Sequence, residues 1–295
     1  MPTALRMGTP GSSAAVVACR ELSAGYRGTP VLEEISFEIR EPAIYVVLGP
    51  NGAGKTTLFR TLAGILNPYH GAVTIDGRSI EEQATKDRLH FLSHIDGLPD
   101  GLRVVEALRL YGTVEGADEE DVERVLGLLE IEPLRRRFVS ELSAGQKKRV
   151  AIARIFLRER DVYLLDEPTA NLDPKVAGEI RDLILRRSRD RIVLYSSHNL
   201  FEAREIGTYV LALNSGRLTL FRRISEMTPA KYVVGIRVVA GEENLPSSIK
   251  KGDYFLYELP GPEAVAGLLK ELEGKGVQVR EVKEMGNPLE DLFAT

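Results

Sequence analysis

The amino-acid sequence predicts an α/β fold with a parallel sheet at its centre. Residues 43–48 form a continuous apolar run that leads into a glycine-rich stretch and then into a helical segment. Three further strand-like runs, at residues 162–165, 192–196 and 209–213, are separated by helical segments. Buried strands that alternate with helices are typical of a parallel sheet, whose ligand site lies at the carboxyl ends of its strands.

The region before the first buried strand predicts a different kind of sheet. Residues 1–15 are rich in Thr, Gly, Ser and Pro and lack the apolar core of a secretory signal, so we expect a disordered lead-in. Residues 16–39 alternate as short strands with breaks at 23–25 and 28–30, which indicates an antiparallel β subdomain.

After the glycine-rich stretch, the pattern predicts a helix over residues 56–66 and a strand over 72–75 with a turn at 76–77. Residues 85–137 have helical periodicity, and we place a helical subdomain at about 85–160.

The C-terminal part changes character near Thr228, which predicts a core domain at 16–227 and a small α+β appendage at 228–295. Before that point, the sequence predicts a hairpin turn at 214–217 and a strand at 218–221. In the appendage it predicts strands at 233–239, 254–259 and 277–282, and an amphipathic helix at 263–273.

Composition excludes several classes of protein. The net charge of −4 gives no basic excess, so nucleic acid is not an expected partner. No apolar run approaches the ~20 residues of a membrane-spanning helix. The single cysteine, Cys19, excludes an internal disulfide and lies in an apolar strand pattern, which predicts a buried side chain. We therefore expect a cytoplasmic chain whose membrane role depends on a partner.

Residues 49–56, GPNGAGKT, match the phosphate-binding loop G-x-x-x-x-G-K-[ST]. Glycines let the backbone N–H groups approach phosphates at a helix N-terminus. Lys55 is expected to reach the β- and γ-phosphates, and the Thr56 hydroxyl to bind Mg²⁺. The sequence therefore predicts binding of a nucleoside triphosphate by Gly49, Asn51, Gly52, Ala53, Gly54, Lys55, Thr56 and Thr57.

Residues 162–167, VYLLDE, place two carboxylates at the end of an apolar strand. Asp166 is expected to hold Mg²⁺ through water, and Glu167 to polarise the water that attacks the γ-phosphate.

Residues 142–146, LSAGQ, precede another helix, for which Ser143 is a natural N-cap. The residues alone also allow a plain capped helix. Together with the two motifs above, however, the segment resembles the signature motif of the ABC ATPases, the subunits that bind and hydrolyse ATP in ABC transporters. The resemblance covers about residues 16–221, and the common family form has Gly at Ala144. It implies a P-loop ABC ATPase core, ATP and Mg²⁺ as cofactors, and ATP hydrolysis.

The resemblance assigns further positions. It implies that Tyr26 stacks on adenine, that Asp173 lies in a loop at a dimer interface, and that His198 contacts the γ-phosphate. Ser143, Gly145 and Gln146 match positions that close over the nucleotide of a second copy. His94 stands where the family usually has a glutamine that meets Mg²⁺ and the membrane partner; whether His94 keeps that role stays open.

Residues 287–293, NPLEDLF, resemble the closing motif of exporter-type ATPases. The resemblance thus implies the ATPase subunit of an ABC exporter, bound to a transmembrane permease on the inner face of the membrane and paired with a second ATPase subunit, as a homodimer. Two alternatives stay open: a soluble ABC ATPase of cluster assembly, and an importer ATPase.

Overall fold

The computed structural model describes residues 15–94, 97–187, 189–227 and 232–285, together with Leu289 and Leu292. The chain splits into two compact units, residues 1–223 and residues 224–295. The predicted lead-in lies outside the described residues except for Ala15, which is buried. Of the 287–293 motif, only Leu289 and Leu292 are described.

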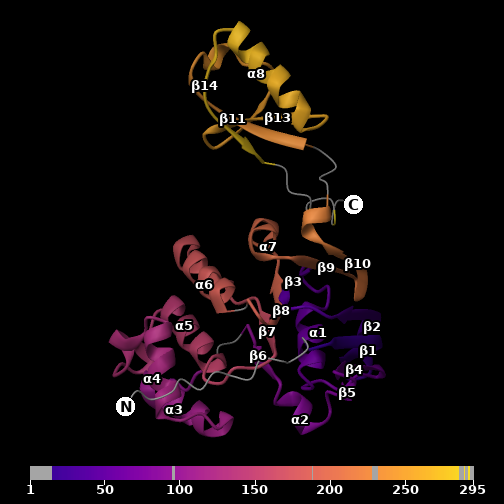
Figure 1. Cartoon of the computed structure of the whole chain (residues 1–295), viewed down its shortest axis with the longest axis vertical. Coiled ribbons are helices and arrows are strands. Elements are labelled where there is room, and N and C mark those ends of the chain that lie inside the picture. The colour runs from indigo at the N-terminus through magenta and orange to yellow at the C-terminus, as the bar shows by residue number, and fades with distance from the viewer. Residues whose placement is uncertain are drawn as a thin grey trace, which may run out of the picture. The chain divides into compact units, whose positions relative to one another are not determined.

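A six-stranded sheet in the order β10-β9-β3-β8-β7-β6 forms the centre of the first unit (Figure 1). Neighbouring strands from β9 to β6 are parallel, and β10 adds antiparallel to β9 through a turn in which Ser215 and Gly216 both have positive φ. The predicted parallel α/β core is therefore confirmed. The strands are β3 (Ala43–Leu48), β6 (Leu89–Leu92), β7 (Val162–Asp166), β8 (Ile192–Ser197), β9 (Tyr209–Asn214) and β10 (Arg217–Arg223).

The predicted antiparallel sheet is also present, in the order β2-β1-β4-β5. The predicted break at residues 23–25 is wrong, because β1 continues through it with register shifts against β2. Such bulges absorb extra residues without ending a strand. The strands are β1 (Val17–Tyr26), β2 (Thr29–Ile39), β4 (His70–Ile75) and β5 (Arg78–Ser79).

Helices α3, α4 and α5 contact one another and lie together on one side of the six-stranded sheet (Figure 1). Two boundaries differ from the prediction. The helix after the glycine-rich loop ends at Leu62, just before Gly64 with φ 64°, and β6 interrupts the stretch read as helical from residue 85. The helices of this unit are α1 (Lys55–Leu62), α2 (Gln83–Lys86), α3 (Val104–Glu115), α4 (Glu119–Leu128), α5 (Ala144–Ile155), α6 (Pro174–Arg187) and α7 (Leu200–Ile206).

The second unit has its own small core. A four-stranded antiparallel sheet in the order β12-β13-β11-β14 packs against one helix, with Ile236 and Leu272 fully buried. The strand β12 was not predicted, because its three residues are all exposed and show no alternation. The elements are β11 (Tyr232–Ala240), β12 (Ile249–Lys251), β13 (Tyr254–Leu259), α8 (Val265–Gly274) and β14 (Gln278–Glu284).

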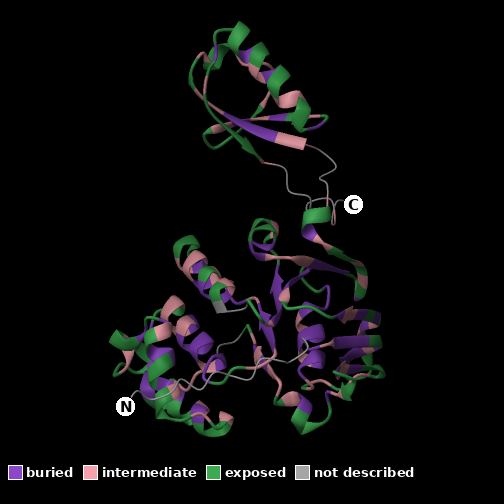
Figure 2. Ribbon diagram, viewed as in Figure 1, coloured by how far each residue is buried: buried purple, intermediate pink, exposed green. Residues whose placement is uncertain are grey.

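The inner strands of the six-stranded sheet, β9, β3, β8 and β7, are mostly buried (Figure 2). The strands β7 and β8 are buried along their whole length, as a sheet covered on both faces requires. The described part of the chain contains no helix that is long and apolar enough to cross a membrane.

Candidate functional site

The strand order brings the predicted site together at the carboxyl edge of the sheet. β3 ends at the glycine-rich loop, β7 ends at Asp166, and β8 ends just before His198. Leu48 pairs with Ser197, and Asp166 pairs with Ser196, so these three strand ends are level with one another.

The glycine-rich loop turns tightly from β3 into α1. Gly54 has φ 101°, and a Cβ on Gly49 would lie 2.5 Å from the carbonyl oxygen of Leu213. Only glycine fits both requirements without strain. The loop therefore presents its backbone at the N-terminus of α1, where the N–H groups and the helix dipole favour an anion. In this loop Asn51 and Gly52 are exposed, and Ala53 and Gly54 are buried.

Lys55 is buried at the first position of α1. Its Nζ donates hydrogen bonds to the carbonyl oxygens of Gly49 at 2.8 Å and Pro50 at 3.3 Å, and lies 3.9 Å from Glu167 Oε1. Burial lowers the pKa of Lys55, and the nearby carboxylates of Glu167 and Asp166 oppose that effect. Phosphate oxygens are stronger acceptors than these carbonyls, so the ammonium group is available to a triphosphate.

Asp166 is completely buried, and its two oxygens have different surroundings. Oδ1 accepts a hydrogen bond of 2.7 Å from the Ser196 hydroxyl. Oδ2 accepts none from the residues that the structure describes, and the imidazole Nδ1 of His94 lies 3.7 Å away. A buried oxygen without a donor is costly, unless a cation or a water molecule uses it.

This orphaned oxygen fits the predicted metal role of Asp166. Within the described ranges, no three His, Cys, Asp or Glu side chains are grouped so that they could hold a metal ion themselves. An ion here would therefore complete its oxygen shell with phosphate and water, as Mg²⁺ does in nucleotide sites. Thr56, predicted as a further ligand, is half-buried on α1, and Thr57 beside it is buried.

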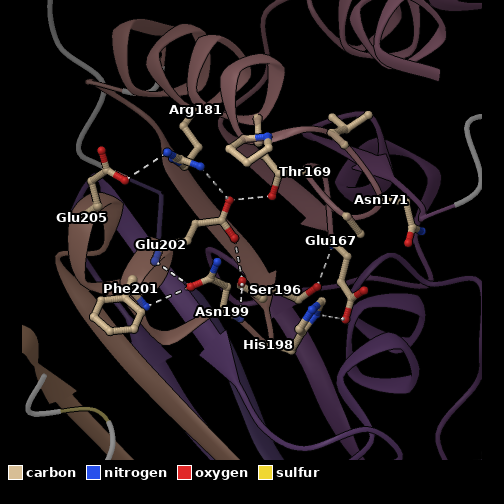
Figure 3. Close-up of a pocket in the computed structure, with 15 residues that line it drawn as sticks. Glu167, Thr169, Asn171, Arg181, Ser196, His198, Asn199, Phe201, Glu202 and Glu205 are labelled. Carbon is tan, nitrogen blue, oxygen red and sulfur yellow. Dashed lines mark hydrogen bonds and ion pairs between the residues drawn. The ribbon is translucent and has the colours of Figure 1, made fainter. Parts of the chain in front are cut away.

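Glu167 follows Asp166 in a left-handed backbone conformation, with φ 48°. Its N–H donates a hydrogen bond of 2.8 Å to Ser196 Oγ, and its Oε1 lies 3.6 Å from His198 Nδ1 (Figure 3). Non-glycine residues adopt positive φ rarely, and such conformations concentrate at functional sites. The bend directs the Glu167 carboxylate toward both His198 and Lys55.

The segment 143–146 lies elsewhere in the unit. Ser143 Oγ accepts from the N–H of Gln146 at 3.3 Å, and Gln146 Oε1 accepts from the N–H of Ser143 at 3.1 Å. These bonds form a capping box at the start of α5. Among the described residues, no hydrogen bond or ion pair joins Ser143, Gly145 or Gln146 to the glycine-rich loop, and α5 lies well apart from α1 (Figure 1).

Gly145 packs closely against α6: a Cβ there would lie 2.8 Å from Val176 Cγ1, so a larger residue would force Val176 to shift. Asp173 also has a structural role, because its Oδ1 accepts from the N–H of Val176 at 3.1 Å in the first turn of α6. Tyr26 is exposed at the end of β1, and its hydroxyl accepts from the Arg60 guanidinium at 3.1 Å.

Ser196 was missed by sequence reasoning. Its hydroxyl makes two hydrogen bonds at the end of β7: it donates to the side chain of Asp166 and accepts from the backbone N–H of Glu167. The available signal was the change from an apolar strand to two serines, Ser196 and Ser197, directly before His198.

Comparison with known proteins decides the family. The family model described as ABC transporter matches residues 32–170. The energy-coupling factor transporter ATP-binding protein EcfA of Methanoculleus marisnigri is 37% identical over 210 residues, which cover 68% of this chain and 76% of that protein. The chain belongs to the ABC transporter family.

This ABC transporter protein is similar to relatives with opposite transport directions in their names. The Nod factor export ATP-binding protein I of Cupriavidus metallidurans is 29% identical, and the match covers 95% of this chain and 96% of that protein. The Fe(3+) ions import ATP-binding protein FbpC of Escherichia coli is also 29% identical, over 83% of this chain and 74% of that protein.

A solved structure of an ATP-binding subunit of an ABC transporter superposes with a TM-score of 0.66 at 26% identity, covering 72% of this chain and 91% of that one. The chain is thus an ABC ATPase: an ATP-binding subunit of the kind that serves ABC transporters, and it hydrolyses ATP.

Proposed function

We propose that this chain is the ATPase subunit of an ABC exporter and works as a head-to-tail pair of identical copies on a transmembrane permease. The observation that carries the pairing is the division of the site. The glycine-rich loop, Asp166, Glu167 and His198 gather at one sheet edge, while Ser143 and Gln146 cap a helix in another part of the unit. A second copy, related by a two-fold axis, supplies the missing helix N-terminus to each site.

In this proposal the chain's own groups share the chemistry. The loop N–H groups and Lys55 bind the phosphates, and Tyr26 stacks on adenine. Glu167 orients the attacking water and accepts its proton, and His198, 3.6 Å away, contacts the γ-phosphate. Mg²⁺, held by Thr56 and by Asp166 with His94 beside it, would neutralise the phosphate charge.

Hydrolysis then opens the pair. The γ-phosphate binds the Ser143 helix of the partner copy, so its loss removes the attraction between the copies. Asp173, which directly precedes α6, lies at the boundary between the copies in this arrangement. We further propose residues 16–227 as the ATPase domain, with a helical subdomain at about 85–160, and residues 228–295 as a partner-facing appendage.

Export is supported by the match to the Nod factor export protein, which extends over nearly the whole of both chains and includes the C-terminal unit. The 287–293 motif agrees with it. Import is the second candidate, because the iron import protein matches over most of this chain. The proposed location follows from the permease: the inner face of the cell membrane.

Two measurements test the proposal. Affinity-tagged chain, extracted from its own cells with mild detergent, should copurify with a polytopic membrane protein; a soluble scaffold in its place would favour cluster assembly. Untargeted comparison of metabolites should then show a compound that accumulates inside a deletion strain and disappears from its medium. Loss of a compound from the cells, with its retention in the medium, would indicate import.

A further inference from the structure

A buried carboxylate lies directly behind the proposed site. Glu202, in the first turn of α7, has a side chain that is 5% exposed. It forms part of the wall of a cavity of about 370 Å³ that Glu167 and His198 also line (Figure 3). None of the roles proposed for the site involves this carboxylate.

Three hydroxyl groups donate to the two oxygens of Glu202. Thr169 Oγ1 and Tyr195 Oη bond Oε1 at 2.5 Å and 2.8 Å, and Ser197 Oγ bonds Oε2 at 2.6 Å. A guanidinium nitrogen of Arg181 lies 3.7 Å from Oε1. The carboxylate is therefore fully supplied with donors, which is the condition for burying such a group without a large penalty.

The donors come from the two segments that carry the reacting side chains. Thr169 follows Glu167 by two residues, and Ser197 immediately precedes His198. Glu202 thus bonds at the same time to the loop that carries Glu167 and to the end of the strand before His198.

The start of α7 shows the same connection. Asn199 caps the helix through Oδ1, which accepts from the N–H groups of Phe201 and Glu202. In an ordinary capping box, a glutamate at the position of Glu202 would bond the backbone N–H of the cap residue. Here that N–H donates to Ser197 Oγ, and Ser197 donates onward to Glu202. Ser197, the residue before His198, therefore bridges the cap residue Asn199 and Glu202.

From this geometry we infer that Glu202 is a positioning residue for ATP hydrolysis: its carboxylate holds Thr169 and Ser197 so that Glu167 and His198 keep their mutual placement. Glu202 touches neither nucleotide nor water in this role. The inference rests on the roles proposed for Glu167 and His198. Its expected signature is a loss of turnover with unchanged ATP binding, because misplacing a reacting group by about 1 Å can cost on the order of 10²-fold in rate.

The chain offers matched controls. Glu202→Gln keeps the shape and removes the charge. Glu205→Gln makes the same change on the same helix, at an exposed carboxylate that lies 3.2 Å from Arg181. Thr169→Val keeps the shape without the hydroxyl, whereas Thr169→Ser keeps the hydroxyl. The last pair separates hydrogen bonding from packing.

We expect Glu202→Gln and Thr169→Val to lower kcat by about 10-fold or more, with KM for ATP close to wild type. Each change leaves a buried hydrogen bond unmade, so the melting temperature should fall by roughly a few degrees while the protein stays folded at the assay temperature. Thr169→Ser and Glu205→Gln should stay within about twofold of wild-type kcat. A kcat loss that merely follows a loss of folded protein, or equal activities of Thr169→Val and Thr169→Ser, would overturn the inference. If Glu202→Gln does not fold, the Thr169 pair still decides.

Glu167→Gln and His198→Ala, assayed in parallel, separate the proposed site from the positioning role. If both keep wild-type turnover, the proposed site itself is wrong. If both lose turnover while Glu202→Gln and Thr169→Val retain it, only the positioning role of Glu202 is wrong.

Discussion

The Ser196 hydroxyl donates a hydrogen bond of 2.7 Å to Asp166 Oδ1, and both side chains are fully buried. This bond fixes the orientation of the carboxylate. Its other oxygen, Oδ2, accepts no hydrogen bond from the described residues and can bind a cation. Because groups that orient a metal-binding side chain typically contribute about 10- to 100-fold to affinity or activity, Ser196 is a sensitive position.

Ser196→Ala should therefore raise the Mg²⁺ concentration needed for half-maximal ATPase activity by about 10-fold or more. Ser215→Ala, in the hairpin between β9 and β10, is a suitable control. Titration of activity with Mg²⁺ checks the prediction, and an unchanged half-saturation point would show that the bond from Ser196 does not orient a metal-binding carboxylate.

Ser143→Asp separates the cap of α5 from the proposed contact with a second copy. Aspartate is as good an N-cap as serine, so the melting temperature should change little. Its negative charge would repel the partner's γ-phosphate, so ATPase activity should collapse while ATP binding to the chain's own loop stays normal. Equilibrium binding and turnover, measured on the same preparation, distinguish these effects. Wild-type turnover would contradict the head-to-tail pairing.

His94 lies 3.7 Å from Asp166 and occupies the usual glutamine position of the family. His94→Gln should keep kcat within about threefold of wild type, since an amide also offers an oxygen for a water or metal contact. His94→Ala should lower kcat further, by about 10-fold, because no polar group remains there. Steady-state ATPase assays at saturating Mg²⁺ compare the two. Equal activity of both variants would remove His94 from the chemistry.

Cys19 should be inert in the folded protein. Its side chain is 1% exposed, its thiol donates to the Ile35 carbonyl at 3.4 Å, and burial raises the pKa of the thiol from 9.0 to about 12. Since the thiolate is the reactive form, alkylation at pH 8 should be negligible until the protein unfolds. Mass spectrometry after iodoacetamide treatment, with and without guanidinium, gives the answer. Rapid labelling of the native chain would mean that β1 opens readily.

The sequence predicted the site best where one segment carries its whole chemistry. The apolar strand, the glycine-rich loop and Lys55 lie within 13 consecutive residues, so local pattern was enough (residues 43–55). The bond between Ser196 and Asp166 joins residues 30 positions apart. It depends on β8 lying between β3 and β7, and no local pattern specifies that order.

Glu202 was missed for the same reason. In the sequence it is one glutamate among the first residues of a helix, and only the packing of α7 against the strand ends buries it. The strand at 89–92 was predicted as helical, because the periodicity of a short apolar run does not distinguish a strand from a helix.

The ATPase activity of Glu167→Gln, measured together with its association state, tests the central claim most directly. The variant should bind ATP almost normally and hydrolyse it at least ~10²-fold more slowly, since a general base contributes roughly that much. With hydrolysis blocked, ATP should hold two copies together, and gel filtration should show a dimer with ATP and a monomer without it. Wild-type turnover, or a monomer at saturating ATP, would contradict the account.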